Sequence, residues 1–337
     1  MANYIGNSEF KHDTGSCTGV LVTNIGTPDA PTPSALRRYL GEFLADPRIV
    51  EVPRFIWWFV LHGFILRTRP QRSAAAYRKI WTESGSPLLA ISKKQATAIQ
   101  KYLDDHATEK FHVELAMRYG NPSIQSGLKK LQRANAKKII ILPLYPQYSA
   151  STTASAFDAV ADVLKTWRNI PELHLVKHYH DTPDYIDALA ESIADQWRQT
   201  NRAEKILFSF HGIPKAYFEA GDPYYCECHK TARLVAEKLN LDEEEWMLTF
   251  QSRFGPKEWL KPYTDMTLKE LAFQGIKNVD VVCPGFSADC LETLEEINMR
   301  YRETFLAAGG EKFTYIPALN DRPTHINALT NIILNHN

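Results

Sequence analysis

The sequence predicts an α/β fold made of two similar lobes, each with a parallel β-sheet flanked by helices. First, short runs rich in β-branched residues alternate along the chain with segments of helical periodicity, which is typical of parallel sheets. Second, the two halves repeat the same series of motifs. Third, 337 residues are enough for two domains of roughly 150 residues each.

The individual elements follow from this alternation. Apolar runs predict strands at 19–24, 112–118, 138–142, 173–178, 205–210, 246–253 and 279–283. Helical periodicity predicts helices at 34–44, 92–103, 123–134, 183–199, 231–239, 260–274, 289–308 and 323–334. Helices therefore separate most of the strands, as crossover connections between parallel strands require.

The repeat is visible in the turns that follow the strands. The first strand leads to Gly26-Thr-Pro28, and the first strand of the second half leads to Gly212-Ile-Pro214. A later strand ends in Arg118-Tyr-Gly120 in one half and in Arg253-Phe-Gly255 in the other. We therefore interpret the halves as a pseudo-repeat.

The repeat sets the expected domain boundaries. We expect a first lobe at 1–165 and a second at 166–310, with a C-terminal helix in 311–337 packing back on the first lobe. The stretch between the first two strands is much longer in the first half, which indicates an insertion at about 46–87. Insertions after the carboxyl end of a strand are where α/β proteins place ligand contacts.

The insertion holds one strongly apolar segment, Phe55–Leu66. It is too short to span a membrane, because a spanning helix needs about 20 apolar residues. Arg54, Arg67 and Arg69 flank it. It could form a buried helix, an apolar lip over a ligand cleft, or a patch resting on a membrane surface.

Composition excludes several classes of protein. Lys plus Arg and Asp plus Glu both number 39, so the net charge is 0, which argues against a nucleic-acid binder that relies on bulk positive charge. The chain has five cysteines, an odd number and a small one for its length, so they do not form a disulfide framework. This favours a reducing compartment and a cytoplasmic location. Met1–Ser16 lacks an apolar stretch, so we expect no secretory signal.

The turns also lack the common nucleotide and hydrolase signatures. Neither Gly26-Thr-Pro28 nor Gly212-Ile-Pro214 matches the glycine-rich loops that bind dinucleotides or nucleoside triphosphates. Gly285–Asp289 lacks the second glycine of a serine-hydrolase nucleophile elbow.

His211 is the first residue that could carry chemistry. It comes directly after a predicted strand, at the edge where parallel sheets place their sites. A neutral imidazole there could accept a proton or bind a metal. The alternative is a histidine that only satisfies backbone groups of the loop.

Carboxylates follow the matching strand of the same half. Asp289 and Glu292 have the spacing of a helix N-cap and its N3 residue, so the pair could be a capping box, which spacing alone favours. The alternative is a functional carboxylate, because Glu292 and Glu296 share one helix face. Such a pair could relay protons or a divalent cation.

Other loops fit a large planar ligand with acidic substituents. Tyr145–Thr153 mixes rings with hydroxyls, and Trp259 and Phe286 offer further flat surface. Tyr77–Ile80 and Ser84–Pro87 offer cations and hydroxyls for ligand carboxylates.

Two short patterns could bind a metal. Cys226-x-Cys228-His229 does not have the ligand spacing of a structural zinc site and lacks a fourth ligand. His178-Tyr-His180 at a strand end is a second possible pair, although surface histidines are common. The remaining cysteines, Cys17, Cys283 and Cys290, are expected to pack as small apolar groups.

Taken together, the motifs resemble those of ferrochelatases, the lyases that insert Fe²⁺ into a porphyrin to make heme. The resemblance covers about Gly19 to Leu334 and is greatest to the compact bacterial members. The motifs that carry it are Leu21-Val-Thr-Asn-Ile-Gly-Thr-Pro28, Tyr77-Arg-Lys-Ile80, Ser84-Gly-Ser-Pro87, Tyr145-Pro-Gln-Tyr-Ser-Ala-Ser-Thr-Thr153, Ser209-Phe-His-Gly-Ile-Pro214, Phe254-Gly-Pro-Lys-Glu-Trp-Leu260 and Glu292-Thr-Leu294.

The resemblance implies two Rossmann-like lobes with a porphyrin cleft between them. It implies that His211 and Glu292 face each other across the macrocycle as catalytic residues and metal ligands, which overrides the capping interpretation. It places the apolar insertion at the lip of the cleft, and in some members on the membrane surface. Expected substrate-binding residues are Tyr145, Trp259, Phe286, Arg78, Lys79 and Ser86, and expected relay residues are Glu296 and Asp289.

The resemblance also bears on cofactors. Many eukaryotic members hold a 2Fe–2S cluster through a cysteine that is Ala150 here and through a C-terminal tail that has no cysteine here. We therefore expect no such cluster and no cofactor beyond the substrate Fe²⁺. Those members also have a histidine where this chain has Cys290.

The expected reaction is insertion of Fe²⁺ into protoporphyrin IX with release of two protons, the terminal step of heme biosynthesis. Insertion into coproporphyrin III, insertion of Co²⁺ or Ni²⁺, and a non-catalytic tetrapyrrole carrier are the alternatives. Oligomeric state stays open, and the apolar segment is compatible with peripheral contact at the inner face of the cell membrane.

Overall fold

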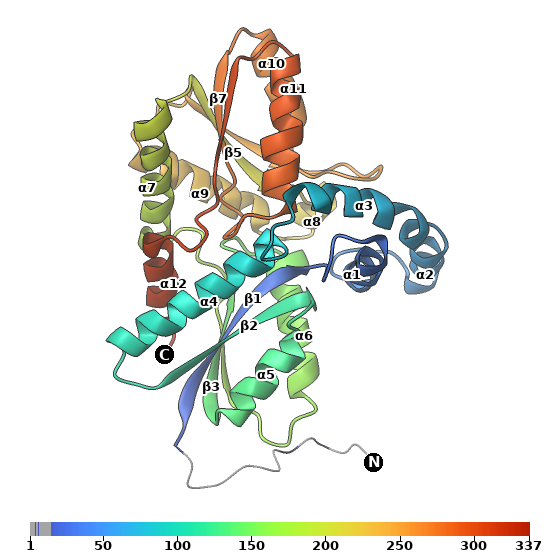
Figure 1. The fold of residues 1–337 in the computed structure, drawn as a ribbon, viewed down its shortest axis with the longest axis vertical. Helices are drawn as coiled ribbons and strands as arrows, with labels where there is room; N and C mark the ends of the chain where they lie inside the picture. Colours follow the sequence, from blue (N-terminus) through green and yellow to red (C-terminus); the bar gives the residue numbers. More distant parts are fainter. Residues whose placement is uncertain (1–3, 5, 7–14) are drawn as a thin grey trace. The chain divides into compact units, whose positions relative to one another are not determined.

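The computed structural model describes residue 4, residue 6 and residues 15–337. The expectation about a secretory signal at Met1–Ser16 falls mostly outside these residues. Within them, eight strands form two four-stranded sheets, and the chain divides into two compact units (Figure 1). Unit 1 comprises residues up to Leu144, Ala150–Lys177 and Ile326–Asn337, and unit 2 comprises Tyr145–Ser149 and His178–His325.

Unit 1 is built on a parallel sheet with the strand order β2-β1-β3-β4. Its core joins Leu21 and Ile141 of the sheet to Leu128 and Val160 of two helices. Figure 1 shows these helices, α5 and α6, lying along the sheet. The strands are β1 (Cys17–Thr27), β2 (Phe111–Gly120), β3 (Ala136–Pro143) and β4 (Glu172–Leu175), and the helices that accompany β2 and β3 are α5 (Ile124–Arg133), the π-helix η2 (Ala150–Ala154) and α6 (Ser155–Leu164).

The expected insertion of unit 1 is helical. The residues expected to form it, about 46–87, hold α2 (Arg54–Val60), the π-helix η1 (Leu61–Ile65) and α3 (Leu66–Ile80), while α1 (Pro33–Ala45) precedes them and α4 (Pro87–His106) follows. Leu61 and Leu66 pack on Leu40 and Leu44 of α1. This contact anchors the apolar segment by one edge only.

The other edge of the apolar segment faces solvent. Phe55, Trp58, Phe59 and Phe64 are 70%, 56%, 67% and 67% exposed. The interpretation of this segment as a buried helix is therefore wrong, because most of its large side chains are exposed. In the part of the chain that the structure describes, no helix has the length and apolar character needed to cross a bilayer.

Unit 2 repeats the sheet of unit 1. Its strands have the parallel order β6-β5-β7-β8, and its core contains Leu207, Val281, Ile297 and Phe305. The strands are β5 (Lys205–His211), β6 (Trp246–Gln251), β7 (Asn278–Val282) and β8 (Lys312–Ile316). The helices are α7 (Pro183–Thr200), α8 (Lys215–Glu219), α9 (Tyr224–Lys238), α10 (Thr264–Phe273), the π-helix η3 (Glu292–Tyr301) and α11 (Arg302–Ala307).

The predicted fold class, two similar α/β lobes with parallel sheets flanked by helices, is confirmed by the matching strand orders. The expected boundaries need correction, because strand pairing assigns the strands near them. β4 pairs with β3 and belongs to the first sheet, although it lies beyond residue 165. β8 pairs with β7 and belongs to the second sheet, although it lies in 311–337.

The last helix, α12 (Pro323–Asn335), begins at the end of unit 2 and continues in unit 1. Beyond it, the side chain of Asn337 accepts a hydrogen bond from Thr18 at 3.1 Å and donates one to Glu109 at 2.7 Å. Only residues 326–337 of the expected 311–337 segment are therefore grouped with the first sheet.

Candidate functional site

The last residue of β5, His211, has a fixed ring orientation. Its Nδ1 lies 2.6 Å from the carbonyl oxygen of Gly212. A carbonyl can only accept, so Nδ1 carries the proton, and Nε2 of the neutral ring keeps its lone pair. The half-buried imidazole can therefore act as a base or a metal ligand through Nε2.

The turn after His211 brings an aromatic ring close to it. The Gly212 amide donates to the carbonyl of Gln251 at 2.8 Å. A Cβ on Gly212 would lie 3.0 Å from that oxygen and 3.1 Å from the Trp259 ring, so the close approach requires glycine. The centroids of the His211 and Trp259 rings are 6.4 Å apart.

Trp259 is nearly buried, with 6% of its surface exposed. Within the described residues, its indole N–H has no hydrogen-bond acceptor. Its ring centroid lies 4.9 Å from that of Phe254. Both residues line a surface hollow of about 450 Å³ formed by the segment from Arg253 to Tyr263. A planar ligand would find aromatic surface here, mainly that of the exposed Phe254 ring, because the indole N–H of Trp259 is buried.

Glu292 is the first residue of η3, and Gln251 ties it to the sheet. Gln251 lies opposite His211 in the β5–β6 ladder, and its side-chain amide donates to the Glu292 carbonyl at 3.1 Å. The structure thus attaches both predicted catalytic residues to one glutamine of β6. π-Helices are rare and occur often at functional sites.

The capping-box interpretation of Asp289 and Glu292 is wrong. The residue before η3 is Leu291, and it makes no side-chain cap. Oδ1 of Asp289 instead accepts from Thr293 at 3.0 Å and from Tyr315 at 2.5 Å, and Oδ2 accepts from Asn320 at 2.8 Å. The Asp289 carboxylate is therefore fully occupied by neighbours from three segments.

Glu292 contacts Cys290, the residue two positions before it in the sequence. Burial, followed by the charge of Glu292 and a hydrogen bond with its side chain, raises the pKa of the Cys290 thiol well above its usual value. Cys290 is therefore a neutral thiol that donates to Glu292, and not a thiolate ligand.

Glu296 is more tightly held than Glu292. Its Oε2 accepts from Ser252 and, at 3.4 Å, from Gln251, and its Oε1 accepts from Tyr301 at 2.8 Å. Arg300 lies 3.5 Å from the same Oε1. Burial and the Glu296 charge raise the pKa of Tyr301, so that phenol stays a donor.

The other predicted substrate-binding residues have mixed surroundings. In unit 2, Tyr145 is buried, and Phe286 is half-buried against the core. In unit 1, the Arg78 guanidinium donates to the Pro31 carbonyl at 3.2 Å, and Lys79 is exposed next to it on α3. Ser86 is buried at the start of α4, where its hydroxyl accepts from Thr27 at 2.8 Å.

Sequence reasoning missed Gln251 and Ser252. Both lie at the end of the strand next to β5, and that position is the signal that could have identified them. The structure also argues against a shared site at Cys226 and Cys228. Cys226 is exposed and Cys228 is fully buried, because residues two apart on α9 point in different directions.

The comparisons with known proteins concern nearly the whole chain. A family model described as Ferrochelatase matches residues 17–337. A ferrochelatase of Thioalkalivibrio sulfidiphilus is 57% identical over 98% of this chain and 89% of its own length. A ferrochelatase of Nitrosococcus oceani is 54% identical over 99% of this chain and 90% of its own length.

Solved structures agree on the fold. The chain aligns with SirB from Bacillus subtilis with Fe³⁺ at a TM-score of 0.56 and 11% identity, covering 95% of both chains. It aligns with the sirohydrochlorin chelatase SirB in complex with cobalt at a TM-score of 0.52 and 12% identity, over 94% of this chain and 93% of the other. With relatives above half identity along its length, this chain is a metal chelatase that belongs to the ferrochelatase family.

Proposed function

We propose that this protein inserts Fe²⁺ into protoporphyrin IX, forming protoheme and releasing two protons, as the terminal step of heme biosynthesis. The observation that carries the proposal is the His211 ring, whose Nδ1 bond to Gly212 leaves Nε2 as a base beside Trp259. Family membership supports metal chelation as the class of reaction.

The chemistry requires a base and a distorted macrocycle. Two pyrrole N–H protons block the centre of a free porphyrin, and a bent ring exposes the nitrogen lone pairs to the metal. A site that binds the bent ring favours the transition state over the flat ground state. In our proposal, Nε2 of His211 accepts each pyrrole proton in turn and passes it to solvent, while the four nitrogens bind the metal.

The carboxylates of η3 have different roles in this proposal. Glu292, whose carboxylate contacts the neutral Cys290 thiol, ligates the incoming Fe²⁺ or accepts a proton. Glu296 has four donors around its oxygens, which supports a positioning role more than the predicted relay. Asp289 is similarly occupied, so we assign it to holding the start of η3 in place.

For the porphyrin, we propose that Trp259, Tyr145 and Phe286 contact its face and that Arg78 and Lys79 bind its propionates. Ser86 is a weaker candidate, because its hydroxyl already accepts a bond from Thr27. Independence from a 2Fe–2S cluster stays a prediction.

The exposed apolar segment favours protoporphyrin over its more acidic alternative. Phe55, Trp58, Phe59 and Phe64 present rings to solvent, and such a surface suits vinyl-bearing protoporphyrin better than the four carboxylates of coproporphyrin III. The chemistry at His211 does not distinguish Fe²⁺ from Co²⁺ or Ni²⁺.

The decisive experiment is anaerobic incubation of the protein with Fe²⁺ and protoporphyrin IX, following loss of porphyrin fluorescence and growth of heme absorbance. Coproporphyrin III, and Co²⁺ or Ni²⁺ in place of Fe²⁺, run in parallel. His211→Ala should lower the insertion rate by about 10²–10⁴-fold and leave porphyrin binding intact, with His112→Ala as the control.

Each result has a defined meaning. Faster turnover of coproporphyrin III would keep the mechanism and change the substrate. Tight porphyrin binding without insertion by the wild type would favour the non-catalytic carrier. Normal turnover by His211→Ala would refute the role of His211.

We further propose that the apolar segment rests on the inner face of the cell membrane. Six of its side chains (Phe55, Ile56, Trp58, Phe59, Val60 and Phe64) are at least 40% exposed. Burial of such rings at a lipid interface is favourable in proportion to their apolar area. Trp58→Ala with Phe59→Ala should reduce co-sedimentation with anionic phospholipid vesicles, whereas Phe273→Ala, which removes a ring that is 78% exposed on α10, should not. Equal sedimentation of both variants would contradict membrane contact through this segment.

A further inference from the structure

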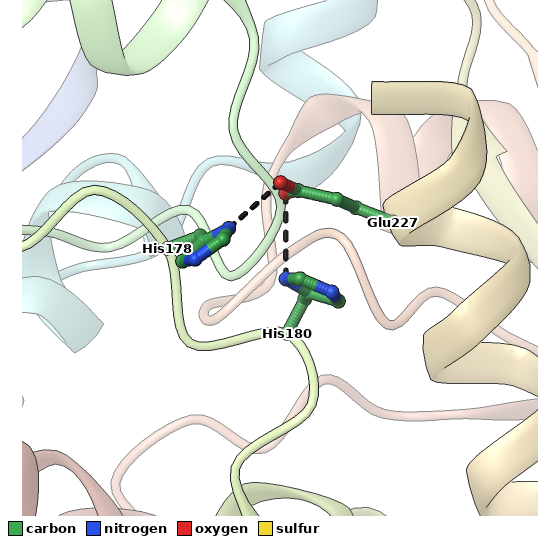
Figure 2. A group of neighbouring side chains, drawn as sticks. All are labelled: His178, His180 and Glu227. Carbon is green, nitrogen blue, oxygen red and sulfur yellow. Dashed lines mark hydrogen bonds and ion pairs between the residues drawn. The ribbon is translucent and has the colours of Figure 1, made fainter. Parts of the chain in front are cut away.

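A second group of metal-ligating side chains lies in unit 2 and shares no residue with the proposed insertion site. His178 and His180 lie between β4 and α7, and Glu227 lies in the first turns of α9. One potential ligand atom from each of the three residues lies within 4.8 Å of the other two. Figure 2 shows the Glu227 carboxylate facing both imidazoles, with a dashed line to each.

The contacts of Glu227 hold it in place between the rings. Its Oε1 lies 2.7 Å from Nδ1 of His178, and its Oε2 lies 3.4 Å from Nδ1 of His180. The backbone amide of Tyr148 donates to Oε2 at 2.6 Å. The Thr231 hydroxyl, one turn along α9, donates to the His180 carbonyl at 2.9 Å and fixes the segment that carries the histidines.

His180 is the observation that points to a ligand. The residue is 4% exposed, and within the described part of the chain its Nδ1 has no hydrogen-bond partner. A buried ring nitrogen without a partner is costly unless something binds it. The ring nitrogen faces a carboxylate at 3.4 Å, a spacing that an ion between them would fill.

We propose that His178, His180 and Glu227 form a second metal site, which takes a borderline divalent ion of the Zn²⁺ or Co²⁺ type. Two imidazoles and one carboxylate are a donor set that such ions accept, with water in the open position. Donors bound at about 2.0–2.2 Å lie about 3–4 Å from one another, so small side-chain rotations bring these three onto one ion.

The surroundings supply an outer shell and an entrance. The Asp181 carboxylate lies 3.9 Å from Nε2 of His180 and is itself held by Lys230 at 2.5 Å. The carboxylate is therefore near the second ring nitrogen of His180 but beyond hydrogen-bond distance of it. The His178 side chain is 40% exposed and gives solvent access to the site. The bound ion would pin the start of α9 to the segment before α7.

The test uses the full-length protein and Co²⁺ alone. In a His211→Ala, Glu292→Gln background, which removes the proposed insertion ligands, we expect one Co²⁺ per chain and visible bands of nitrogen and oxygen ligation. Adding His178→Gln or Glu227→Gln should weaken binding more than about 10-fold. His174→Gln is the matched control, because His174 also contacts a carboxylate, that of Glu172 at 2.6 Å, but belongs to no three-residue group of potential ligands among the residues that the structure describes.

A measurement without substitutions guards against misfolded variants. Two equivalents of Zn²⁺, enough to fill the proposed insertion site as well, should protect His178 of the wild type from carbethoxylation, as located by mass spectrometry. Unchanged modification, absence of Co²⁺ binding in the background variant, or full binding by His178→Gln would overturn the proposal. So would a thiolate-to-cobalt charge-transfer band, which would move the ion to Cys226. None of these readouts depends on porphyrin insertion, so the two proposals fail separately.

Discussion

At the end of β1 the chain passes through Ile25 and Gly26, whereas at the end of β5 it passes through His211 and Gly212. Both strands are second in sheets of the same order, and both turns continue to a proline two residues after the glycine. One position that is apolar in unit 1 therefore carries an imidazole in unit 2. The matching sheets show that topology supplies the place for a functional group, and the residue at the strand end decides whether it is used.

The third strands extend the comparison. β3 is followed by the π-helix η2 (Ala150–Ala154), which holds small and hydroxyl side chains, and β7 is followed by η3 (Glu292–Tyr301), which holds carboxylates. Both units therefore keep a rare helix type after the same strand. In unit 2 the neighbouring strand β5 also ends in His211, whereas the matching position of β1 is Ile25, which is why we place the chemistry in unit 2.

The largest effect is expected from the paired glycines. Gly26 has a φ of +106°, and a Cβ there would lie 1.9 Å from the Tyr119 carbonyl oxygen, whereas on Gly212 it would lie 3.0 Å from the nearest atom. Gly26→Ala should therefore cost about 4 kcal/mol, since strain and overpacking add. Gly212→Ala should cost about 1–2 kcal/mol and lower the insertion rate by moving His211.

Urea unfolding followed by the hydrogen exchange of each strand measures the two stability losses separately, because the exchange reports on β1 for Gly26→Ala and on β5 for Gly212→Ala. Gly63→Ala is the control, because a Cβ there meets nothing within 4 Å. Similar costs at Gly26 and Gly212 would show that the two turns are constrained to the same degree.

The next effect concerns the carboxylate that unit 1 lacks. Glu292→Gln keeps the shape of the side chain and the backbone bond to Gln251 but removes the charge. We expect insertion to slow by about 100-fold, within the range for a group that transfers protons, with little change in the urea midpoint. Glu303→Gln, at an exposed position of α11, should leave the rate unchanged. A Glu292→Gln variant with normal turnover would remove η3 from the mechanism.

Local patterns predicted much of the fold. Seven strands were expected close to their observed positions, because β-branched runs such as Lys137–Leu142 are bounded by polar residues and proline. β8 (Lys312–Ile316) was not expected, since five residues between a helix and a loop give a weak signal. α10 begins at Thr264 and not at 260, because Pro262 comes before it.

The site was predictable only where its residues stand at the ends of predicted elements. His211 and Glu292 stand at strand and helix ends that the pattern located, but the occupation of Asp289 by Tyr315 and Asn320 depends on a strand and a loop far along the chain. Glu227 was hidden between two cysteines that drew attention as ligands. Its link to His178 is a tertiary contact that spacing along the chain does not encode.

The last pair of effects comes from one buried aspartate in each unit, and the two should have opposite dependence on pH. In unit 1, burial alone would raise the pKa of Asp46, but hydrogen bonds from Ser155 and Tyr119 and the charge of Arg118 hold it below its usual value. In unit 2, burial raises the pKa of Asp280 despite its bond from Trp197.

The sign of each contribution follows from linkage. Asp46 stabilises unit 1 fully above the pKa of the unfolded chain, about 3.9, and this stability is lost as the pH falls through the lower folded value. Asp280 does the reverse, since its protonated form favours the folded state and that contribution disappears as the pH rises through the raised pKa. Lowering the pH should therefore decrease the stability of the region around β1 and β2 and increase that of the region around β7.

At pH 7, Asp46→Asn should lower the free energy of unfolding by about 3 kcal/mol. In the wild type the nearly buried Arg118 guanidinium lies 2.5 Å from the Asp46 carboxylate, and the substitution removes this counter-charge. It should also flatten the acid dependence of unit 1. Asp280→Asn should change the free energy of unfolding by less than about 1 kcal/mol. The Trp197 indole donates to the Asp280 carboxylate at 2.7 Å in the wild type, and the amide oxygen of asparagine can still accept this bond. Hydrogen exchange of β1 and β7 at pH 4 and pH 7 measures both, and a loss of protection at low pH that is equal in the two strands would show that these carboxylates do not control the acid response.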